Sequence, residues 1–432
     1  MLIETNIEVN FRSIEEFTRV MVSELLEDKI NFEILKENNL IKIKVKSEKL
    51  NKNTEFSYID LGNKIEDQIL TMCKISLLKL LDKKYDWGSL MGVRPTKVLR
   101  RLLINGCDYK EARKILKDFY LVTDEKINLM ETVVKKELEL LDKEHINLYI
   151  GIPFCPTKCK YCSFASYEIN GGVGRFYNDF VEALLKEIQI VGDFLKTYSK
   201  KISSIYFGGG TPSTLTEEDL ERVLKKLLEN IDMADVKEFT FEAGREDSLN
   251  IKKLEIMKKY SVDRISLNPQ SFNLETLRRV NRRFNRENFD LIFKEAKKLE
   301  FIINMDLIIG LPEETTEEIL NTLSQLKDYD IDNLTIHCLA FKRASKLFKE
   351  NQERNIIDRV LIEKYIQKIV EEKTMKPYYM YRQKNIIEWG ENIGYSKEGK
   401  ESIFNIEMIE ENQNTMALGG GGISKIVIEE RN

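Results

Sequence analysis

Short apolar runs alternate with amphipathic stretches through the middle of the chain, between residue 146 and about residue 345. The runs that predict buried strands are NLYIG, ISSIYF, VKEFTFE, RISLN, INMDLII and LTIHCLA. The stretches after the first five repeat apolar residues at helical spacing, as in FYNDFVEALLKEIQIVGDFL. Thr315 and Glu318 fit a capping box at the start of one such helix. Repeated strand–helix steps without hairpin signals favour a parallel α/β sheet, either open and Rossmann-like or curved into a barrel.

The flanking segments follow other patterns. ETNIEVNF, SIEEFTRVMVSELLED, NFEILKENN and LIKIKVKSE predict a small β-α-β-β unit, and amphipathic stretches after it predict helices. Between those helices, DWGSLMGVRPTKVLRRL predicts an ordered loop that leads into a helix. We therefore expect three parts: an N-terminal α+β domain over 1–145, a core over 146–345, and a small C-terminal α+β region over 346–432.

Composition narrows the classes of protein. Of 432 residues, 32% are charged and 42% apolar, and the net charge of −4 gives no reason to expect nucleic acid as a partner. The first residues lack a basic segment followed by an apolar one, and no apolar stretch reaches 18 residues, so we expect neither a signal peptide nor a membrane span. Six cysteines, three of them in one cluster, do not form a disulfide framework, and reduced thiols predict a cytoplasmic location.

The three clustered cysteines, Cys155, Cys159 and Cys162, stand in CPTKCKYC, directly after the first predicted core strand. Three thiolates at this spacing can hold one iron–sulfur cluster and leave one iron without a protein ligand, whereas electron-transfer clusters normally have four cysteines. A zinc site needs a fourth ligand, and neither His145 nor His337 lies at a finger-like spacing. A thioredoxin-like CKYC pair would leave Cys155 unexplained, and the polar residues between the cysteines do not form an apolar core face.

Further polar residues follow the other core strands. The second strand ends in FGGGTPS, whose consecutive glycines allow close approach of a ligand and N–H groups that cradle a carboxylate. The later strands end near Glu242, Gln270 and Asp306. Because the carboxyl ends of parallel strands meet at one rim, these side chains predict a pocket for a polar nucleoside.

The core resembles the coproporphyrinogen-III oxidase-like branch of the radical S-adenosylmethionine (SAM) superfamily. The motifs that carry the resemblance, in order, are YIGIPFCPTKCKYC, YFGGGTPS, RISLNPQSFNLETLRRVNRR, MDLIIGLPEET and LTIHCLAFKRAS. The flanking segments WGSLMGVRPTKVLRRL, KPYYMYRQKN, ENIGYSKEGKESIFNI and ALGGGGISK resemble the HemZ type of that branch. This resemblance implies a partial TIM-type barrel of six β/α units.

The resemblance also implies the cofactors and the residues that bind them. Cys155, Cys159 and Cys162 would ligate a [4Fe-4S] cluster whose fourth iron is chelated by SAM. Residues expected at the SAM site are Tyr149, Gly209, Gly210, Thr211, Glu242, Gln270, Arg282 and Asp306. Relatives bind a second SAM, for which Tyr161 and Ala340 are the candidates.

The implied reaction begins with one electron from a donor such as flavodoxin or ferredoxin, which leads to SAM cleavage and a 5′-deoxyadenosyl radical. The substrate would be coproporphyrinogen III, whose oxidative decarboxylation yields protoporphyrinogen IX and supplies haem biosynthesis. Four substrate carboxylates favour arginine or lysine partners. The candidates are Arg94, Lys342, Arg343 and Arg382.

Two departures from the family pattern keep alternatives open. The dehydrogenase branch has a fourth cysteine where this chain has Phe164, and a histidine where it has Gly151. A phenylalanine after the third cysteine is typical of HemW-like haem chaperones and of HemZ. The alternatives are therefore a haem-binding chaperone, in which His337 would be a candidate axial ligand, and a radical SAM enzyme that modifies another tetrapyrrole.

Overall fold

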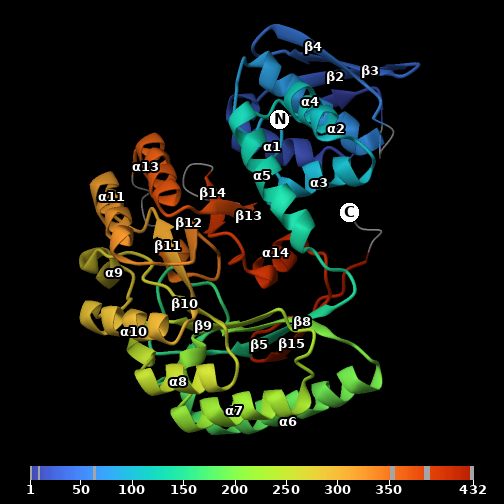
Figure 1. Cartoon of the computed structure of the whole chain (residues 1–432). Helices are drawn as coiled ribbons and strands as arrows, with labels where there is room; N and C mark the ends of the chain where they lie inside the picture. The colour runs from blue at the N-terminus through green and yellow to red at the C-terminus, as the bar shows by residue number, and fades with distance from the viewer. Residues whose placement is uncertain (1, 8–9, 62–64, 351–355, 384–389, 429–432) are drawn as a thin grey trace. The chain divides into compact units, whose positions relative to one another are not determined.

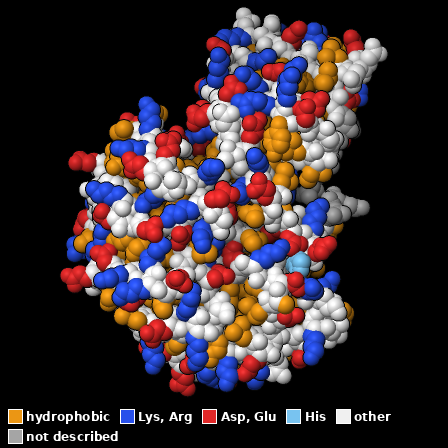
Figure 2. All heavy atoms as spheres, in the orientation of Figure 1, with side chains coloured by type: hydrophobic (Ala, Val, Ile, Leu, Met, Phe, Trp, Pro, Cys, Tyr) orange, Lys and Arg blue, Asp and Glu red, His pale blue; other side chains and the backbone are white. Residues whose placement is uncertain are grey.

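The structure is a computed structural model that describes residues 2–7, 10–61, 65–350, 356–383 and 390–428. The chain forms two compact units, Met1–Val134 and Lys135–Asn432. Acidic and basic side chains are interspersed over the face drawn in Figure 2, as the near-balanced composition predicts. No helix in the described ranges combines the length and the apolar character that crossing a bilayer requires.

The first unit is built on a four-stranded sheet in the order β1-β2-β3-β4. β1 pairs with β2 in parallel, and β2, β3 and β4 pair antiparallel. Its elements are β1 (Leu2–Thr5), α1 (Arg12–Met21), β2 (Lys29–Glu37), β3 (Leu40–Ser47), β4 (Lys52–Ile59), α2 (Ile65–Leu80), α3 (Thr96–Ile104), α4 (Tyr109–Lys114) and the first part of α5 (Asp124–Leu140), whose last residues belong to the second unit. The predicted β-α-β-β unit is confirmed, and β4, whose alternating TEFSYI escaped notice in the sequence, completes the sheet.

The second unit contains a nine-stranded sheet in the order β13-β14-β12-β11-β10-β9-β8-β5-β15. Its strands are β5 (Ile146–Ile152), β8 (Ile202–Gly209), β9 (Glu238–Gly244), β10 (Arg264–Leu267), β11 (Ile302–Ile309), β12 (Asn333–Cys338), β13 (Lys376–Arg382), β14 (Glu391–Ser396) and β15 (Thr415–Gly419). A separate pair, β6 (Phe154–Cys155) and β7 (Tyr167–Glu168), frames the cysteine loop. The six consecutive parallel strands β5, β8, β9, β10, β11 and β12 are those that the sequence predicts, and they have the arrangement of a partial (β/α)6 barrel.

Helices of this unit lie along the outer face of the parallel strands, and α14 lies on the opposite side (Figure 1). Their bounds are α6 (Tyr177–Thr197), α7 (Glu217–Asn230), α8 (Ile251–Lys259), α9 (Leu274–Arg279), α10 (Arg286–Lys298), α11 (Thr316–Gln325), α12 (Lys346–Lys349), α13 (Arg359–Glu372) and α14 (Ile403–Glu410). The Thr315–Glu318 capping box at the start of α11 is present, as predicted. The buried faces of these helices and strands form one continuous apolar core.

C-terminal residues complete the barrel at both edges of the sheet. β14 pairs antiparallel with β12, and β15 pairs in parallel with β5. A β-carbon at Gly151, on β5, would lie 2.5 Å from the carbonyl oxygen of Gly420, so the close approach of the chain after β15 requires glycine there. The segments predicted as core and C-terminal region therefore belong to one compact unit.

A buried polar network at the amino ends of the strands holds the start of α14. The Glu238 carboxylate accepts hydrogen bonds from the Ser402 hydroxyl at 2.8 Å and from the Ile403 N–H at 2.5 Å. The Arg264 guanidinium donates to the carbonyl oxygens of Lys400 and Glu401, both at 2.9 Å. We call this set the base network, and it places α14 beneath the barrel interior.

Candidate functional site

The interior of the barrel contains a cavity of about 460 Å³. The cysteine loop and the carboxyl ends of the parallel strands contribute one part of its lining, and β13 and α14 contribute another. Phe404 of α14 lines the cavity, and its ring stacks on that of Tyr206 with the ring centroids 4.4 Å apart. The α14 side thus forms an aromatic floor, while the cysteines lie at the rim.

The three predicted cluster ligands line this cavity together. Cys155 and Cys159 are each 8% exposed and Cys162 is half-buried. The Thr211 hydroxyl donates to Cys155 Sγ at 3.4 Å, and the Ser166 hydroxyl lies 3.9 Å from Cys162 Sγ. Burial raises the pKa of the Cys155 thiol, and its hydrogen bonds from Thr211 and Ser166 offset part of that rise.

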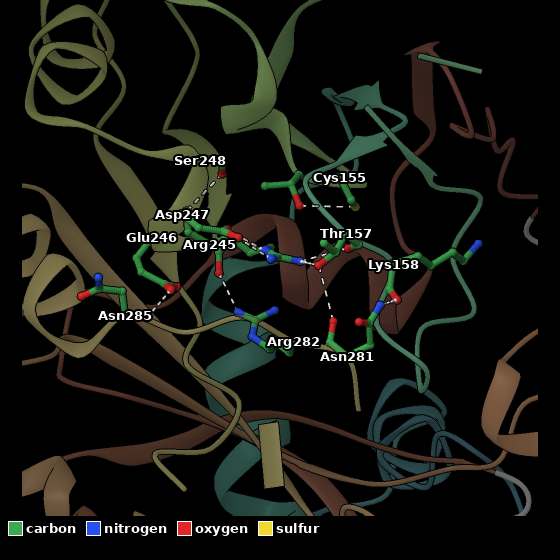
Figure 3. Close-up of polar contacts among 12 residues, drawn as sticks. Cys155, Thr157, Lys158, Arg245, Glu246, Asp247, Ser248, Asn281, Arg282 and Asn285 are labelled. Carbon is green, nitrogen blue, oxygen red and sulfur yellow. Dashed lines mark hydrogen bonds and ion pairs between the residues drawn. The ribbon is translucent and has the colours of Figure 1, made fainter. Parts of the chain in front are cut away.

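A buried arginine that the sequence reading did not single out fixes the backbone between the first two cysteines. Arg245 is 3% exposed, and its Nη1 donates to the carbonyl oxygen of Thr157 at 3.0 Å and to its hydroxyl at 2.9 Å. The Asp247 carboxylate holds the other edge of the same guanidinium, at 2.8 Å and 2.5 Å (Figure 3). Asn281 donates to the carbonyl oxygen of Lys158 at 2.9 Å. The Cys155–Cys159 loop is therefore fixed from β9 and from the segment after α9.

The glycine run FGGGTPS packs closely on the strand that leads into the cysteine loop. The N–H groups of Gly210 and Thr211 donate to the carbonyl oxygens of Ile152 and Phe154, at 2.8 Å and 2.7 Å, so these two are not free to cradle a carboxylate. A β-carbon on Gly210 would lie 2.6 Å from the Phe154 carbonyl oxygen. The run therefore allows the end of β8 to pack directly on the strand that leads into the cysteine loop.

Two acidic side chains whose pKa values are shifted in opposite directions, Glu242 and Asp306, line the cavity. Burial, with a further contribution from Asp306, raises the pKa of Glu242 to about 8. Burial also acts to raise the pKa of Asp306, but hydrogen bonds and charge from His337 and a hydrogen bond from Asn304 hold it below its usual value. Asn268 and Asn304 each donate to Asp306, both at 2.8 Å. The site can thus present one neutral and one ionised acid at neutral pH.

Gln270 and Arg282 reach the same cavity from the segment after β10. Gln270 has a positive φ of 66°, and its buried Oε1 has no hydrogen-bond partner within the described residues. Arg282, 6% exposed, donates to the carbonyl oxygens of Gly244, at 3.1 Å, and Asn268. Arg282 also interacts with Cys159. The unsatisfied amide oxygen fits a missing hydrogen-bond donor on a bound ligand.

The remaining residues predicted at the SAM site lie in the same lining. Tyr149 extends from β5, Tyr161 lies between the last two cysteines, and Ala340 follows β12. Burial raises the pKa of Tyr149 and of Tyr161 well above the usual range, so both phenols stay neutral. The structure therefore brings together the ten residues predicted to contact SAM, and their contacts with SAM stay a prediction.

His337 of β12 and tyrosines of β13 also line the cavity. His337 Nδ1 lies 3.1 Å from the Tyr381 hydroxyl, and its Nε2 lies 3.8 Å from Asp306 Oδ2. Gln383 Nε2 donates to the same hydroxyl at 3.2 Å. The KPYYMYRQKN motif thus lines the cavity through Tyr378, Tyr379, Tyr381 and Gln383, and its last two residues, 384–385, lie outside the described residues.

The four cations predicted to bind substrate occupy different places. Lys342 lines the cavity at its rim, 6.0 Å from the centre of the exposed Phe164 ring, whereas the exposed Arg343 does not line it. Arg382 points from the other face of β13 and is buried near Glu391. Arg94, just before α3, belongs to the first unit. Of the four, the structure brings only Lys342 to the cavity of the second unit.

These features fit an iron–sulfur cluster better than a single metal ion. Within the described ranges, no three histidine, cysteine or acidic side chains converge on one point that could hold an ion. Cluster thiolates need no such convergence, because each binds a different iron. Cys155, Cys159 and Cys162 line one cavity and would hold the group there.

The fold and the site define a protein of the radical SAM class. Residues 149–326 match the model of the Radical SAM superfamily. The structure is similar to HemN from Escherichia coli, a coproporphyrinogen III oxidase described as a radical SAM enzyme, with a TM-score of 0.54 over 67% of each chain. At 20% identity that likeness concerns the fold alone. Radical SAM proteins use a [4Fe-4S] cluster and SAM, which confirms the predicted cofactors.

Proteins of similar sequence show which family of radical SAM proteins the chain belongs to. HemZ of Bacillus subtilis, an oxygen-independent coproporphyrinogen-III oxidase-like protein, is 40% identical over 79% of this chain and 70% of its own. The haem chaperone HemW of the same organism is 31% identical over 44% of this chain and 49% of its own. Anaerobilin synthase of Escherichia coli O157:H7 is 29% identical over 48% of each. The chain belongs to the HemZ family of radical SAM proteins, and it spans about half of the HemW and anaerobilin synthase chains.

Proposed function

We propose that this protein is a radical SAM oxidoreductase that acts on a tetrapyrrole, with oxidative decarboxylation of coproporphyrinogen III to protoporphyrinogen IX as the reaction. The observation that carries the proposal is the 40% identity with a coproporphyrinogen-III oxidase-like protein over most of the chain. It is supported by a cavity in which the three cysteines face an aromatic floor. One electron and SAM at such a cluster supply a radical that abstracts hydrogen from an unactivated carbon.

The residues of this chain have three tasks in that reaction. Cys155, Cys159 and Cys162 would hold the cluster, and Arg245 keeps the loop between the first two in place. Glu242 and Gln270 would bind the nucleoside, the first as a neutral hydrogen-bond donor at neutral pH and the second through its unsatisfied oxygen. The third task, exclusion of water, falls to the aromatic floor.

Substrate carboxylates would find few partners inside the second unit. Its buried arginines already bind protein oxygen atoms: Arg245 at Thr157 and Asp247, and Arg264 at the backbone of α14's first residues. Lys342 and Lys158 are the lysines among the described residues that line the cavity, both near Phe164. We therefore expect a substrate to place its reacting side chain inward and its other carboxylates at this rim, where Arg343 lies in the adjacent sequence.

Anaerobic reconstitution followed by product analysis tests the proposal. Protein loaded with iron and sulfide is incubated with SAM, dithionite and coproporphyrinogen III, and the products are identified by mass spectrometry. We expect 5′-deoxyadenosine together with the mono- and divinyl products, each formed with loss of carbon dioxide. A fully loaded protein that cleaves SAM but leaves the tetrapyrrole unchanged contradicts the decarboxylation and supports another tetrapyrrole substrate.

A second candidate function, haem binding without turnover, is favoured by the HemW relatives and by one observation. His337 is a histidine that lines the cavity, and its Nε2 lies beside Asp306. If the protein is a haem chaperone, titration with haem produces a stoichiometric Soret band that the His337→Ala substitution weakens. Unchanged haem affinity in that variant contradicts axial ligation by His337.

A further inference from the structure

A second depression lies on the outside of the barrel, next to the cysteine loop. It is a groove of about 340 Å³ between the end of α9 and the start of α10, lined by Leu274, Leu277, Arg278, Asn281, Arg282, Arg283 and Phe284. We call it the α9 groove. The residues that line it form the link between β10 and β11.

One side chain is shared by the lining of the α9 groove and that of the cysteine cavity. Arg282 lines both, and inside the cavity it interacts with Cys159. Next to it, Asn281 lines the groove and donates its amide hydrogen to the Lys158 carbonyl within the cysteine loop (Figure 3). The N–H of Lys160 donates to the Val280 carbonyl at 2.9 Å. The backbone between Cys155 and Cys162 thus lies directly behind the groove.

Cations surround this groove although the chain as a whole carries a net charge of −4. Arg278 has a 75% exposed side chain and meets Glu275 only at 3.5 Å, and Arg283 is exposed without an ion-pair partner among the described residues. On the other side of the cysteine loop, the N–H of Leu347 donates to the Lys160 carbonyl, which brings α12 against the same loop. The first residue of α12 adds a further exposed cation, Lys346. The exposed leucine Leu274, at 49%, gives the groove an apolar edge.

We propose that the α9 groove is the surface where an acidic one-electron carrier protein, of the flavodoxin or ferredoxin kind, docks to reduce the cluster. The inference rests on the proposed function, because only a reductive radical reaction needs a carrier. In this step one electron leaves the reduced carrier and enters the oxidised cluster, and no bond is made or broken. Electron transfer weakens steeply with distance, and two residues of this groove, Asn281 and Arg282, bond to the cysteine loop or line the cysteine cavity.

The positive charge of the groove favours a partner with an acidic surface. An acidic surface on the carrier would meet Arg278 and Arg283, and such complementarity raises association rates and orients the encounter. The carrier's exposed cofactor edge would then face Asn281 and Arg282, the two groove residues that touch the cysteine loop or Cys159. Substrate and SAM reach the cluster from the cavity, so a carrier in the groove would not compete with them.

Charge reversal in the groove tests the proposal. The variant Arg278→Glu/Arg283→Glu is compared with Lys225→Glu/Lys368→Glu, which makes the same change in net charge at exposed positions on α7 and α13. Binding of oxidised flavodoxin, and separately ferredoxin, to cluster-loaded protein is measured by calorimetry at low and high salt. We expect the groove variant to bind roughly tenfold more weakly at low salt, with the control unchanged. Arg278→Gln/Arg283→Gln should give about half that effect on a logarithmic scale.

A second measurement separates this inference from the proposed function. Dithionite reduces the cluster without docking, so 5′-deoxyadenosine formation with dithionite should be equal in the unmodified protein and in both double variants. If dithionite yields no SAM cleavage in loaded, unmodified protein, the proposed function is wrong. The docking surface is wrong if neither carrier binds the unmodified protein, or if the groove variant and the control lose the same affinity. Equal melting temperatures and iron contents exclude misfolding as the cause.

Discussion

The two ends of the barrel use the same chemistry for different purposes. At the rim, the guanidinium of Arg245 binds the backbone of the cysteine loop, and that of Arg282 binds two strand-end carbonyls. At the base, Arg264 binds two carbonyls of the chain that leads into α14. A buried arginine is costly unless its donors find acceptors, and at both ends backbone carbonyls accept from the Nη atoms of these arginines.

The two ends of the barrel differ in the segments that their arginines bind. Arg245 holds the loop that carries the predicted cluster ligands, and Arg282 holds strand ends beside the cavity, so loss of either should alter the site while the core persists. The base network joins residues 136 and more positions apart and positions α14, so its loss should weaken the fold while the cysteine loop stays unchanged. Function at one end and stability at the other is the usual division in barrels of parallel strands.

The largest effect is expected at the rim from Cys159→Ala. Two remaining thiolates cannot hold the cluster, so iron content and the cluster's visible absorbance should be lost, together with all SAM cleavage. Because Cys159 is one side chain at the barrel mouth, the melting temperature of metal-free protein should change little. Retention of a full cluster in this variant would falsify the assignment of the three ligands.

At the base, Arg264→Met should lower the free energy of unfolding by about 3–5 kcal/mol, because it leaves the Glu238 carboxylate buried without its arginine. Chemical denaturation of metal-free protein measures the loss. Glu238→Gln in the same background should restore part of the stability, since no unpaired charge then remains. If the variant unfolds like the unmodified protein but loses its cluster, the division between rim and base is incorrect.

Arg245→Lys gives the matching test at the rim. Lysine keeps the charge but cannot hold Thr157 and Asp247 with one planar group, so the cysteine loop should be less well fixed. We expect roughly tenfold faster loss of cluster iron to a chelator, and a changed electron paramagnetic resonance signal of the reduced cluster. Arg264→Lys is the control, which should change stability but neither cluster property.

The smallest effect concerns two buried carboxyl groups, Glu242 at the rim and Asp263 at the base. Burial raises the pKa of Glu242 to about 8 and that of Asp263 to about 6. A raised folded-state pKa means that the folded protein binds more protons than the unfolded chain between the two values, so stability falls as pH rises through that window.

Between pH 6.5 and 7.5, Glu242 should therefore cost metal-free protein about 1 kcal/mol. Glu242→Gln should remove this dependence, and Asp263→Asn should instead flatten the profile below about pH 6. Stability measured against pH in both variants provides the comparison. An unaltered slope near pH 7 in Glu242→Gln contradicts a raised pKa at the rim.

Much of the second unit could be predicted because its signals are local. Each parallel strand is a short apolar run of adjacent residues, and the capping box at Thr315 involves positions three apart. The cysteine spacing likewise specifies a cluster without knowledge of the fold. The strand-end rule placed Glu242, Gln270 and Asp306 at one rim, and the structure brings them together.

Other features escaped because they depend on contacts between distant positions. FEAGRED gives no sign that Arg245 reaches Thr157, which is 88 residues away. The amphipathic segment of α14 does not reveal that Phe404 stacks on Tyr206 inside the barrel. The FGGGTPS run predicts free N–H groups, but the carbonyl oxygens of Ile152 and Phe154 accept hydrogen bonds from those of Gly210 and Thr211.

The amino-acid sequence by itself predicted the order of the core strands and helices, the candidate cluster ligands and the family, because each depends on residues close together in the chain. The tertiary structure alone decided which cations face the cavity, how the C-terminal strands complete the sheet, and that Arg282 lines both the cavity and the α9 groove. The physical reason is that burial and electrostatics are set by the neighbours a side chain meets after folding, and those neighbours come from anywhere in the chain.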